Sequence, residues 1–198
     1  MGLAGSLLAL LSLAWVFGIP TLGKHLVCEQ KGGRSDAILV ENFDPNYLVF
    51  ERAAALLRAG MAERAFVPTG ASTAPEQPNI VSVGIVELMA RVARLQQPEI
   101  IPIRLLEPIS LNAAYQIRDV LLKQNVRSVI VVTPGFRSRR SLLIYADVFG
   151  EAGITTSCVP VFGERTPQNW MRTWHGYQEV AGQHVKLHYY RFFVLPGR

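Results

Sequence analysis

Hydrophobic residues follow two different patterns along the chain. Short apolar runs rich in β-branched residues occur at 37–40, 65–68, 100–103, 128–132 and 155–161, and such runs are typical of strands buried on both faces. Between them, apolar residues return every three or four positions, which predicts amphipathic helices over 47–59, 80–95, 110–123 and 138–149. In the second helix we expect the apolar set to face the core; its members are Val83, Val86, Leu88, Met89 and Val92.

The alternation of strand and helix predicts a three-layer, doubly wound (Rossmann-like) α/β domain with a mostly parallel sheet. In such folds ligands bind beyond the carboxyl ends of the strands. The segments at those ends are 41–44, 69–72, 104–112 and 133–137. Residues 169–193 follow as one or two further helices rich in aromatics. We expect packing over the sheet from these rings rather than a binding box: Trp170, Trp174, Tyr177, Tyr189 and Tyr190.

The first 23 residues contain no charged side chain. The uncharged run from Leu3 to Leu22 would span roughly 30 Å as a helix, which is the hydrocarbon thickness of a bilayer. A cleaved signal peptide is less well supported because no basic n-region and no A-x-A site is present, and a lipoprotein at Cys28 is disfavoured by the bulky Val27. The predicted organisation is a transmembrane anchor at 1–23, a linker at 24–35 and an α/β domain at 36–198.

Two features of the sequence bear on which side of the membrane the domain lies. Lys24, Lys31 and Arg34 follow the apolar run, so the positive-inside rule places the domain in the cytoplasm. Cys28 and Cys158 could pair in an oxidising compartment, but the apolar strand around Cys158 favours a buried thiol.

Composition narrows the function classes. The chain has 198 residues, 49% of them hydrophobic, a mean hydropathy of +0.21 and a formal net charge of +5. This composition excludes a disordered chain and a disulfide-dense mini-protein, and the charge is too small and dispersed to predict nucleic-acid binding. No GxGxxG, P-loop, GxSxG, HExxH or CxxC motif occurs, so the usual dinucleotide, nucleotide, hydrolase and metal signatures are missing from the sequence.

The most distinctive candidate site is the turn from the strand 128–132 into the next helix. Thr133 ends the strand, Pro134-Gly135 turns the chain, and Arg137, Arg139 and Arg140 begin the helix, with Arg137 and Arg140 on one face. A helix N-terminus favours phosphate or carboxylate, whereas basic residues there do not stabilise the helix itself. We therefore expect an anion site, against the alternative of a solvated basic turn.

A second candidate segment precedes the helix at 110–123. Ser110 is expected to be its N-cap, whereas Glu107 and Asn112 have no evident capping role. Glu107 is the tentative catalytic acid or base, and Ser110 and Asn112 are ligand-binding candidates. Thr69-Gly70, after the second strand, is expected to form a small turn where backbone could approach a ligand.

Together these motifs resemble the bacterial YdcF/SanA/ElyC family over about 36–190. The resemblance is carried by Arg52 before Ala59-Gly60, by Thr69-Gly70, by Glu107, Ser110 and Asn112 of an E-x-x-S-x-N-T motif, and by Val132-Thr133 with Phe136-Arg137 and Arg140. Trp174 and Glu179 are similar to a late family Trp and Glu. The chain departs from the family pattern where Ala113 replaces a Thr, Arg137 a His and Ile85 a Glu, and where Glu41-Asn42-Phe43 replaces a Gly-rich turn.

The resemblance implies a membrane-anchored protein of the cell envelope, single-pass in the inner membrane with a periplasmic domain, linked to cell-wall biogenesis. This is opposite to the orientation given by the charge count. If the family site does acid/base work through the replaced groups, this chain could bind a ligand without reacting with it. The leading expectation is a small anionic, phosphorylated ligand, with the enzyme question left open.

Two other function classes stay open. One is a nucleotide or S-adenosylmethionine binder with a transferase role, as the soluble branch of the family implies, in which Glu41 or Asp44 would hold the ribose. The other is a non-catalytic scaffold whose aromatic C-terminal part recruits a protein partner in the envelope.

Overall fold

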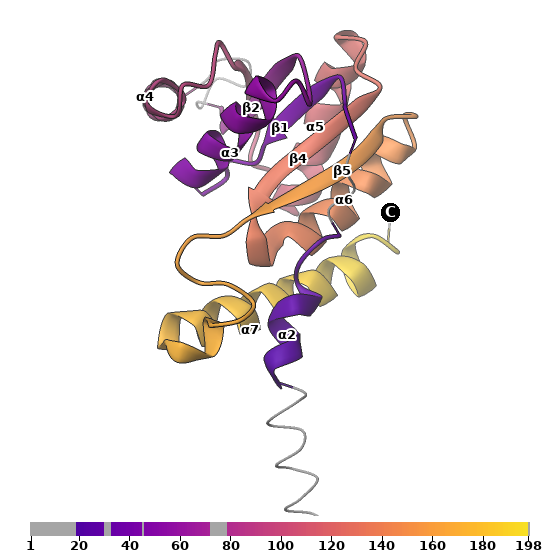
Figure 1. The fold of residues 1–198 in the computed structure, drawn as a ribbon. Helices are drawn as coiled ribbons and strands as arrows, with labels where there is room; N and C mark the ends of the chain where they lie inside the picture. The colour runs from indigo at the N-terminus through magenta and orange to yellow at the C-terminus, as the bar shows by residue number, and fades with distance from the viewer. Residues whose placement is uncertain (1–18, 30–32, 45, 72–78, 198) are drawn as a thin grey trace, which may run out of the picture.

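The computed structural model describes residues 19–29, 33–44, 46–71 and 79–197. Within them lies one five-stranded, all-parallel sheet, in the order β3-β2-β1-β4-β5 (Figure 1). The strands are β1 (Ala37–Val40), β2 (Arg64–Gly70), β3 (Glu99–Ile103), β4 (Ser128–Pro134) and β5 (Thr155–Val161). The predicted α/β class and parallel sheet are thus confirmed.

The helices lie close to the predicted ranges. They are α2 (Ile19–His25), α3 (Tyr47–Arg58), α4 (Ile80–Ala93), α5 (Ile109–Lys123), α6 (Ser138–Gly150) and α7 (Trp174–Tyr189), with 3-10 turns η2 (Gly135–Arg137) and η3 (Trp170–Arg172) and a π-helical turn η4 (Tyr190–Val194). Asn46, Asn79 and Thr173 cap α3, α4 and α7 by accepting backbone N–H groups of the first turn.

The central strand β1 divides the core into two layers. Ala37 and Leu39 face α5 and α6, whereas Ile38 and Val40 face α3 and α4. All four are fully buried, and each larger side chain stabilises the fold by about 1.5–3 kcal/mol relative to exposure. Parallel pairing of β1 with both β2 and β4 places the point where the strand order reverses at the carboxyl ends of β1 and β4.

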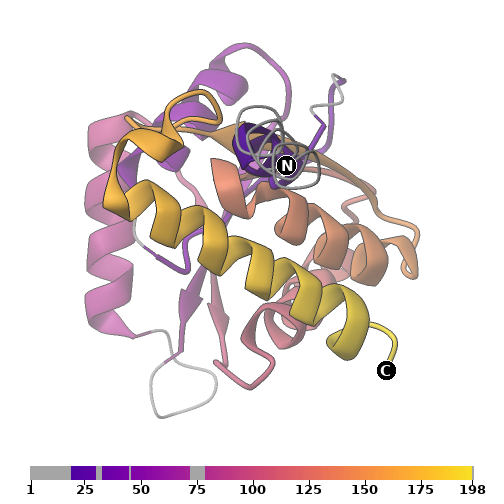
Figure 2. The same cartoon turned by 90° about the horizontal axis from the view of Figure 1, so that it is seen from below.

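A third, smaller cluster joins α7 to the segment before β1. Leu26, Phe136, Trp170, Val180 and Leu187 are buried together there. Figures 1 and 2 show α7 crossing the lower side of the molecule, with α2 beside it. Part of the predicted linker is therefore packed against the domain.

Cys28 and Cys158 form a disulfide, which corrects the expectation of a buried thiol. The bond ties the segment after α2 to β5 across a sequence separation of 130. The strand context of Cys158 was interpreted rightly, since it is completely buried, but the packing of Leu26 on α7 brings Cys28 to it.

The predicted inward set of α4 is wrong in part. Val86 is buried, but Leu88 and Val92 are 61% and 60% exposed. The buried residues of α4 are Val86, Ala90 and Ala93, so only a narrow strip of small side chains on this helix meets the core.

The predicted anchor at 1–23 lies mostly outside the described residues, of which it includes 19–23. No helix within the described ranges is long and apolar enough to cross a membrane.

Candidate functional site

The candidate site lies at the carboxyl ends of β1 and β4. A cleft of about 380 Å³ opens there, lined by Asp44, Asn46, Tyr47, Pro134, Arg137, Glu179 and Gln183. These residues come from the loop after β1, the end of β4 with η2, and α7. The position agrees with the expectation that ligands bind where the strand order reverses.

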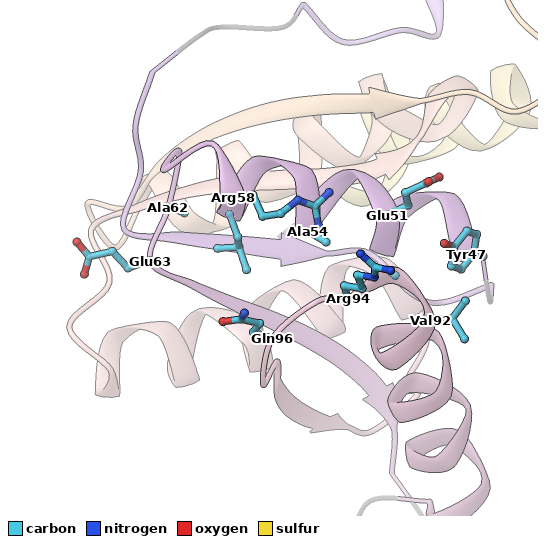
Figure 3. A pocket seen from close by; sticks show the side chains of 11 residues that line it. Tyr47, Glu51, Ala54, Arg58, Ala62, Glu63, Val92, Arg94 and Gln96 are labelled. Atoms are coloured by element: carbon cyan, nitrogen blue, oxygen red, sulfur yellow. The ribbon is translucent and has the colours of Figure 1, made fainter.

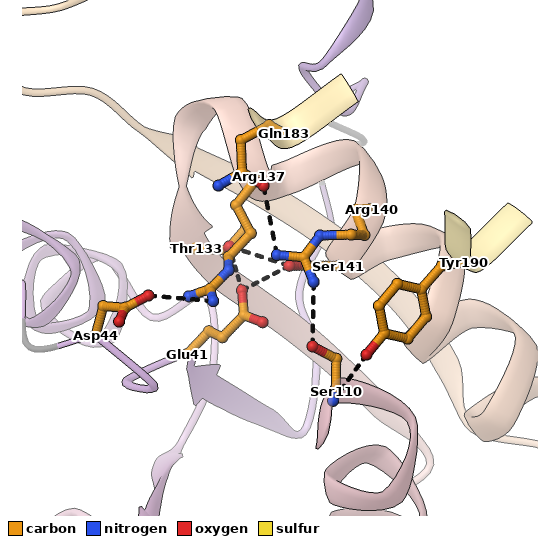
Figure 4. Close-up of polar contacts among 9 residues, drawn as sticks. All are labelled: Glu41, Asp44, Ser110, Thr133, Arg137, Arg140, Ser141, Gln183 and Tyr190. Atoms are coloured by element: carbon orange, nitrogen blue, oxygen red, sulfur yellow. Dashed lines mark hydrogen bonds and ion pairs between the residues drawn. The ribbon is translucent and has the colours of Figure 1, made fainter. Parts of the chain in front are cut away.

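Glu41 is a buried carboxylate at the carboxyl end of β1, close to the residues that line the cleft. It directly follows β1, and its backbone N–H continues the ladder by donating to the carbonyl of Val132. Its Oε2 accepts hydrogen bonds from the Thr133 hydroxyl and, at 2.6 Å, from the Ser141 hydroxyl (Figure 4). These two charge-assisted hydrogen bonds partly offset the free-energy cost of removing the carboxylate from water.

Arg140 is the second buried charge, only 5% exposed. It donates to Ser110 Oγ at 3.1 Å and to Gln183 Oε1 at 3.4 Å, and its guanidinium lies 5.5 Å from the centre of the Tyr190 ring. Among the described residues no carboxylate lies within ion-pair distance of it, and its Nε has no hydrogen-bond partner. Burial, and then the neighbouring Arg137, lower the pKa of Arg140, and the charge of Glu41 partly offsets this.

Arg137 is the guanidinium that lines the cleft. Its side chain is 11% exposed, and it forms an ion pair at 3.2 Å with Asp44, whose own side chain is 84% exposed. The Phe43 ring lies 5.7 Å from the guanidinium carbon, and the buried Nε lacks a partner among the described residues. Arg137 thus presents a nearly buried cation whose only described counter-ion is a solvated, movable carboxylate.

Tyr145 lies beside these charges in the core. Its hydroxyl is buried without a hydrogen-bond partner in the described structure. Burial, followed by the charge of Glu41, raises the pKa of Tyr145 well above its ordinary value, so the phenol stays neutral.

The structure brings four of the predicted site residues, Thr133, Arg137, Arg140 and Ser110, into one polar network that consists of three separate bonded groups. Figure 4 shows Thr133 with Glu41 and Ser141, Arg140 with Ser110 and Gln183, and Arg137 with Asp44. Arg139 lies apart from it: it is exposed, and its Nε donates to the carbonyl of Val27. Arg137 and Arg140 lie close enough that the charge of Arg137 lowers the pKa of Arg140.

Ser110 is not the N-cap of its helix, which corrects the sequence interpretation. α5 begins at Ile109 with Pro108 as N-cap, and the Glu107–Pro108 peptide is cis. Ser110 therefore stands inside the first turn, where its N–H donates to the Tyr190 hydroxyl and its own hydroxyl is free to accept from Arg140.

Glu107 and Asn112 stabilise the loop before α5. Asn112 Nδ2 donates to the carbonyls of Leu106 at 3.2 Å and Glu107 at 2.9 Å, a structural role that the sequence did not indicate. The exposed Glu107 carboxylate accepts from the N–H of Ile109. Neither side chain takes part in the network of Figure 4.

Thr69 and Gly70 also lie outside that network. They are the last residues of β2 rather than a turn after it. They line a separate hollow of about 220 Å³ with Asn42, Ser82 and Leu105. In it, the buried Thr69 hydroxyl and the Asn42 Oδ1 have no hydrogen-bond partner in the described chain.

A larger cavity, of about 740 Å³, runs between α3 and α4 (Figure 3). Its charged residues are exposed: Glu51, Arg58, Glu63 and Arg94. Exposed charges are solvated by water and need no ligand to compensate them. The buried charges at the strand ends do need compensation, so they indicate a specific binding site more strongly than this groove does.

Three residues of the network escaped sequence reasoning. Ser141 and Gln183 lie on helix faces that no motif distinguishes, and Tyr190 was expected only to pack. One signal for Ser141 was present, because a serine one residue after Arg140 interrupts the apolar face of its helix. No group of three His, Cys, Asp or Glu side chains that could hold a metal ion exists among the described residues.

No model of a known protein family matches this chain, and no curated protein is significantly similar to it.

Proposed function

We propose that the cleft at the ends of β1 and β4 binds a small anionic ligand, and that a phosphoryl group is the part recognised by Arg137. The observation that carries this is the pairing of two nearly buried guanidinium groups, of which one meets only neutral acceptors and the other an exposed aspartate. A phosphate could replace Asp44 as the partner of Arg137, because the guanidinium fork matches two phosphate oxygens.

The backbone supports the same class of ligand. η2 and α6 begin directly after β4, so the partial positive charge at the N-terminus of α6 lies near the cleft, while the N–H groups of Ser138 and Arg139 already donate to the carbonyls of Gly135 and Leu26. Glu41 would favour the charged form of Arg140 rather than contact ligand, since it is buried and engaged by Thr133 and Ser141.

We further propose that the protein is anchored in the inner membrane through its apolar N-terminal segment and carries its domain outside the cytoplasm. The disulfide supports this side of the membrane, because such bonds persist in oxidising compartments. The resemblance to the YdcF/SanA/ElyC family adds cell-wall or surface-polysaccharide precursors as the proposed ligand class, and many of these carry phosphate.

A nucleotide or S-adenosylmethionine is the competing ligand class. Its ribose would need a carboxylate, and with Glu41 buried, Asp44 is the carboxylate that lines the cleft and is open to solvent. Catalysis is not part of the proposal, because Glu107 lies outside the network of Figure 4.

The test is a thermal-shift screen of the full chain in detergent against pyrophosphate, a short-chain polyprenyl pyrophosphate, nucleotides and S-adenosylmethionine. A ligand present at 100 times its Kd stabilises the folded state by about 2.7 kcal/mol, which raises Tm by roughly 5–10 °C for a domain of this size. We expect pyrophosphate compounds to give such a shift in the parent protein.

Matched variants separate the site from general charge. Arg137→Gln should abolish the shift, whereas Arg139→Gln should keep it, because Arg139 is exposed and bonded to Val27 only. A shift that survives Arg137→Gln, or no shift with any anion, refutes the proposal. A shift with S-adenosylmethionine alone favours the competing class.

A further inference from the structure

The outer side of α7 and η4 carries five large apolar side chains that are exposed to solvent. They are between 50% and 73% exposed: Trp174, Val185, Tyr189, Phe192 and Phe193. Trp174, Val185 and Phe192 are separated by eleven and seven positions, which places them on one helix face. The opposite face is the packed one, with Val180 and Leu187 buried. Exposed aromatics in this number are unusual for a face that meets only water.

The charges on this helix are positive. Lys186 and Arg191 are exposed, and Arg172 lies exposed just before α7. The single carboxylate of α7, Glu179, is held at 2.8 Å by Arg165. A helix with aromatic and aliphatic residues on one face, and cations beside them, has the composition of segments that lie in the plane of an anionic lipid surface.

The apolar N-terminal segment joins the domain beside this helix. The Leu22 carbonyl lies 3.0 Å from the His184 ring nitrogen, and Leu26 packs with Val180 and Leu187. In Figure 2, seen from below, α7 lies over the rest of the domain with α2 at its side, and in Figure 1 the N-terminal end of α2 extends beyond α7. α2 has seven residues, so a span that ends near its start would lie within about 10 Å of α7.

We infer that the exposed face of α7 and η4 rests on the phospholipid surface of the membrane in which the chain is anchored. The inference depends on the anchoring part of the proposed function and adds a second contact with the bilayer. Trp174 and Tyr189 suit the membrane–water interface, because the ring can lie against the acyl chains while the N–H or O–H group bonds to headgroups or water. Phe192 and Phe193 would enter the outer part of the acyl-chain region. Lys186 and Arg191 meet anionic headgroups.

This contact also orients the candidate site. Gln183, on the inner side of α7, lines the cleft and bonds Arg140, while His184, the next residue, contacts the Leu22 carbonyl. The cleft would therefore open about one helix diameter, roughly 10 Å, from the headgroups. A phosphorylated ligand carried on a lipid would reach Arg137 without leaving the membrane.

The test compares two engineered thiols on the full chain in phosphatidylethanolamine/phosphatidylglycerol vesicles. Val185→Cys and Val81→Cys are matched, since each valine is 71% exposed, and α4 lies at the other end of the molecule (Figure 1). Each is labelled with an environment-sensitive fluorophore, with both native cysteines kept in their disulfide. We expect nitroxide lipids to quench the label at 185 several-fold more than the label at 81, and aqueous iodide to show the reverse.

Flotation of the vesicles measures anchoring separately. A chain that floats with its 185 label as open to iodide as its 81 label refutes the α7 contact and leaves the anchor intact. A chain that does not float refutes both. Protection from iodide without lipid quenching, together with energy transfer between labels, identifies a second copy as the occupant and also refutes the inference. Lys186→Glu combined with Arg191→Glu should weaken lipid quenching at 185 without changing flotation.

Discussion

Opening the Cys28–Cys158 disulfide should destabilise the domain strongly. The bond closes a loop with a sequence separation of 130, and for a loop of this length the chain-entropy relation predicts about 5 kcal/mol at 25 °C. For a domain of this size, each kcal/mol corresponds to about 2–4 °C, so Tm should fall by roughly 10–20 °C. This value is an upper one, because residual structure in the reduced, unfolded chain reduces it.

The assay is thermal and urea unfolding followed by circular dichroism, with and without a phosphine reductant. Cys28→Ala is the control, because it opens the bond and leaves the buried Cys158 thiol in the core. This variant should unfold at the temperature of the reduced parent and should not respond to reductant.

The reasoning is refuted if the reduced parent, with both thiols titrated, lies within about 1 kcal/mol of the oxidised protein. That result would mean that the segment around Cys28 contributes little constraint to the fold. A large effect would instead show that the domain needs an oxidising compartment for its full stability, in agreement with the proposed location.

Three further predictions concern stability and are measured by urea unfolding. Glu41→Gln should destabilise by about 1.5–3 kcal/mol, since it removes the charged acceptor of the Thr133 and Ser141 hydroxyl bonds and the negative charge that favours the charged form of Arg140; a change below about 0.5 kcal/mol would contradict this. Gly176→Ala should cost about 1–3 kcal/mol because its Cβ would lie 1.8 Å from a backbone oxygen of η3, whereas Gly182→Ala, in open space on the same helix, should be neutral or stabilising; equal effects would refute the argument. Two backbone N–H groups hold the pKa of Asp36 below its ordinary value, so its contribution is present above the unfolded-state pKa and disappears as pH falls through the lower folded-state pKa. Asp36→Asn should therefore flatten the loss of stability below roughly pH 4, and an unchanged pH dependence in this variant would contradict the argument.

The local pattern of apolar and polar residues predicted the strands and helices well, because the periodicity and turn residues that specify each element lie within a few positions of one another. The β-branched run at 128–132 is a buried strand in the structure, the apolar run at 155–161 is an edge strand of which only Cys158 and Val159 are buried, and helix boundaries fall within two residues of the predicted ones. Errors arose where the local sequence was compatible with two structural roles for the same residue. Ser110 looked like a cap, but Pro108 is the N-cap and α5 begins at Ile109, so Ser110 lies inside the first turn and its hydroxyl accepts from Arg140.

The aromatic residues of the C-terminal part show the same limit. Tyr190 packs in the core beside the sheet as expected, whereas Trp170 and Tyr177 pack between α7 and the segment before β1, and Trp174 and Tyr189 are largely exposed. A helical spacing says that residues share a face, yet it does not say which face meets the core. That choice depends on where α2 and the strand ends lie beneath the helix.

The sequence by itself determined the alternation of strand and helix, the apolar N-terminal segment and the arginines after β4. It did so because periodicity, charge and turn residues act over short distances along the chain. The tertiary structure decided which strands are neighbours, that Cys28 meets Cys158, and that Arg140 is buried against Ser110, Gln183 and Tyr190. These partners are 30 to 130 positions apart, and only packing of the whole sheet and its helices brings them within bonding distance.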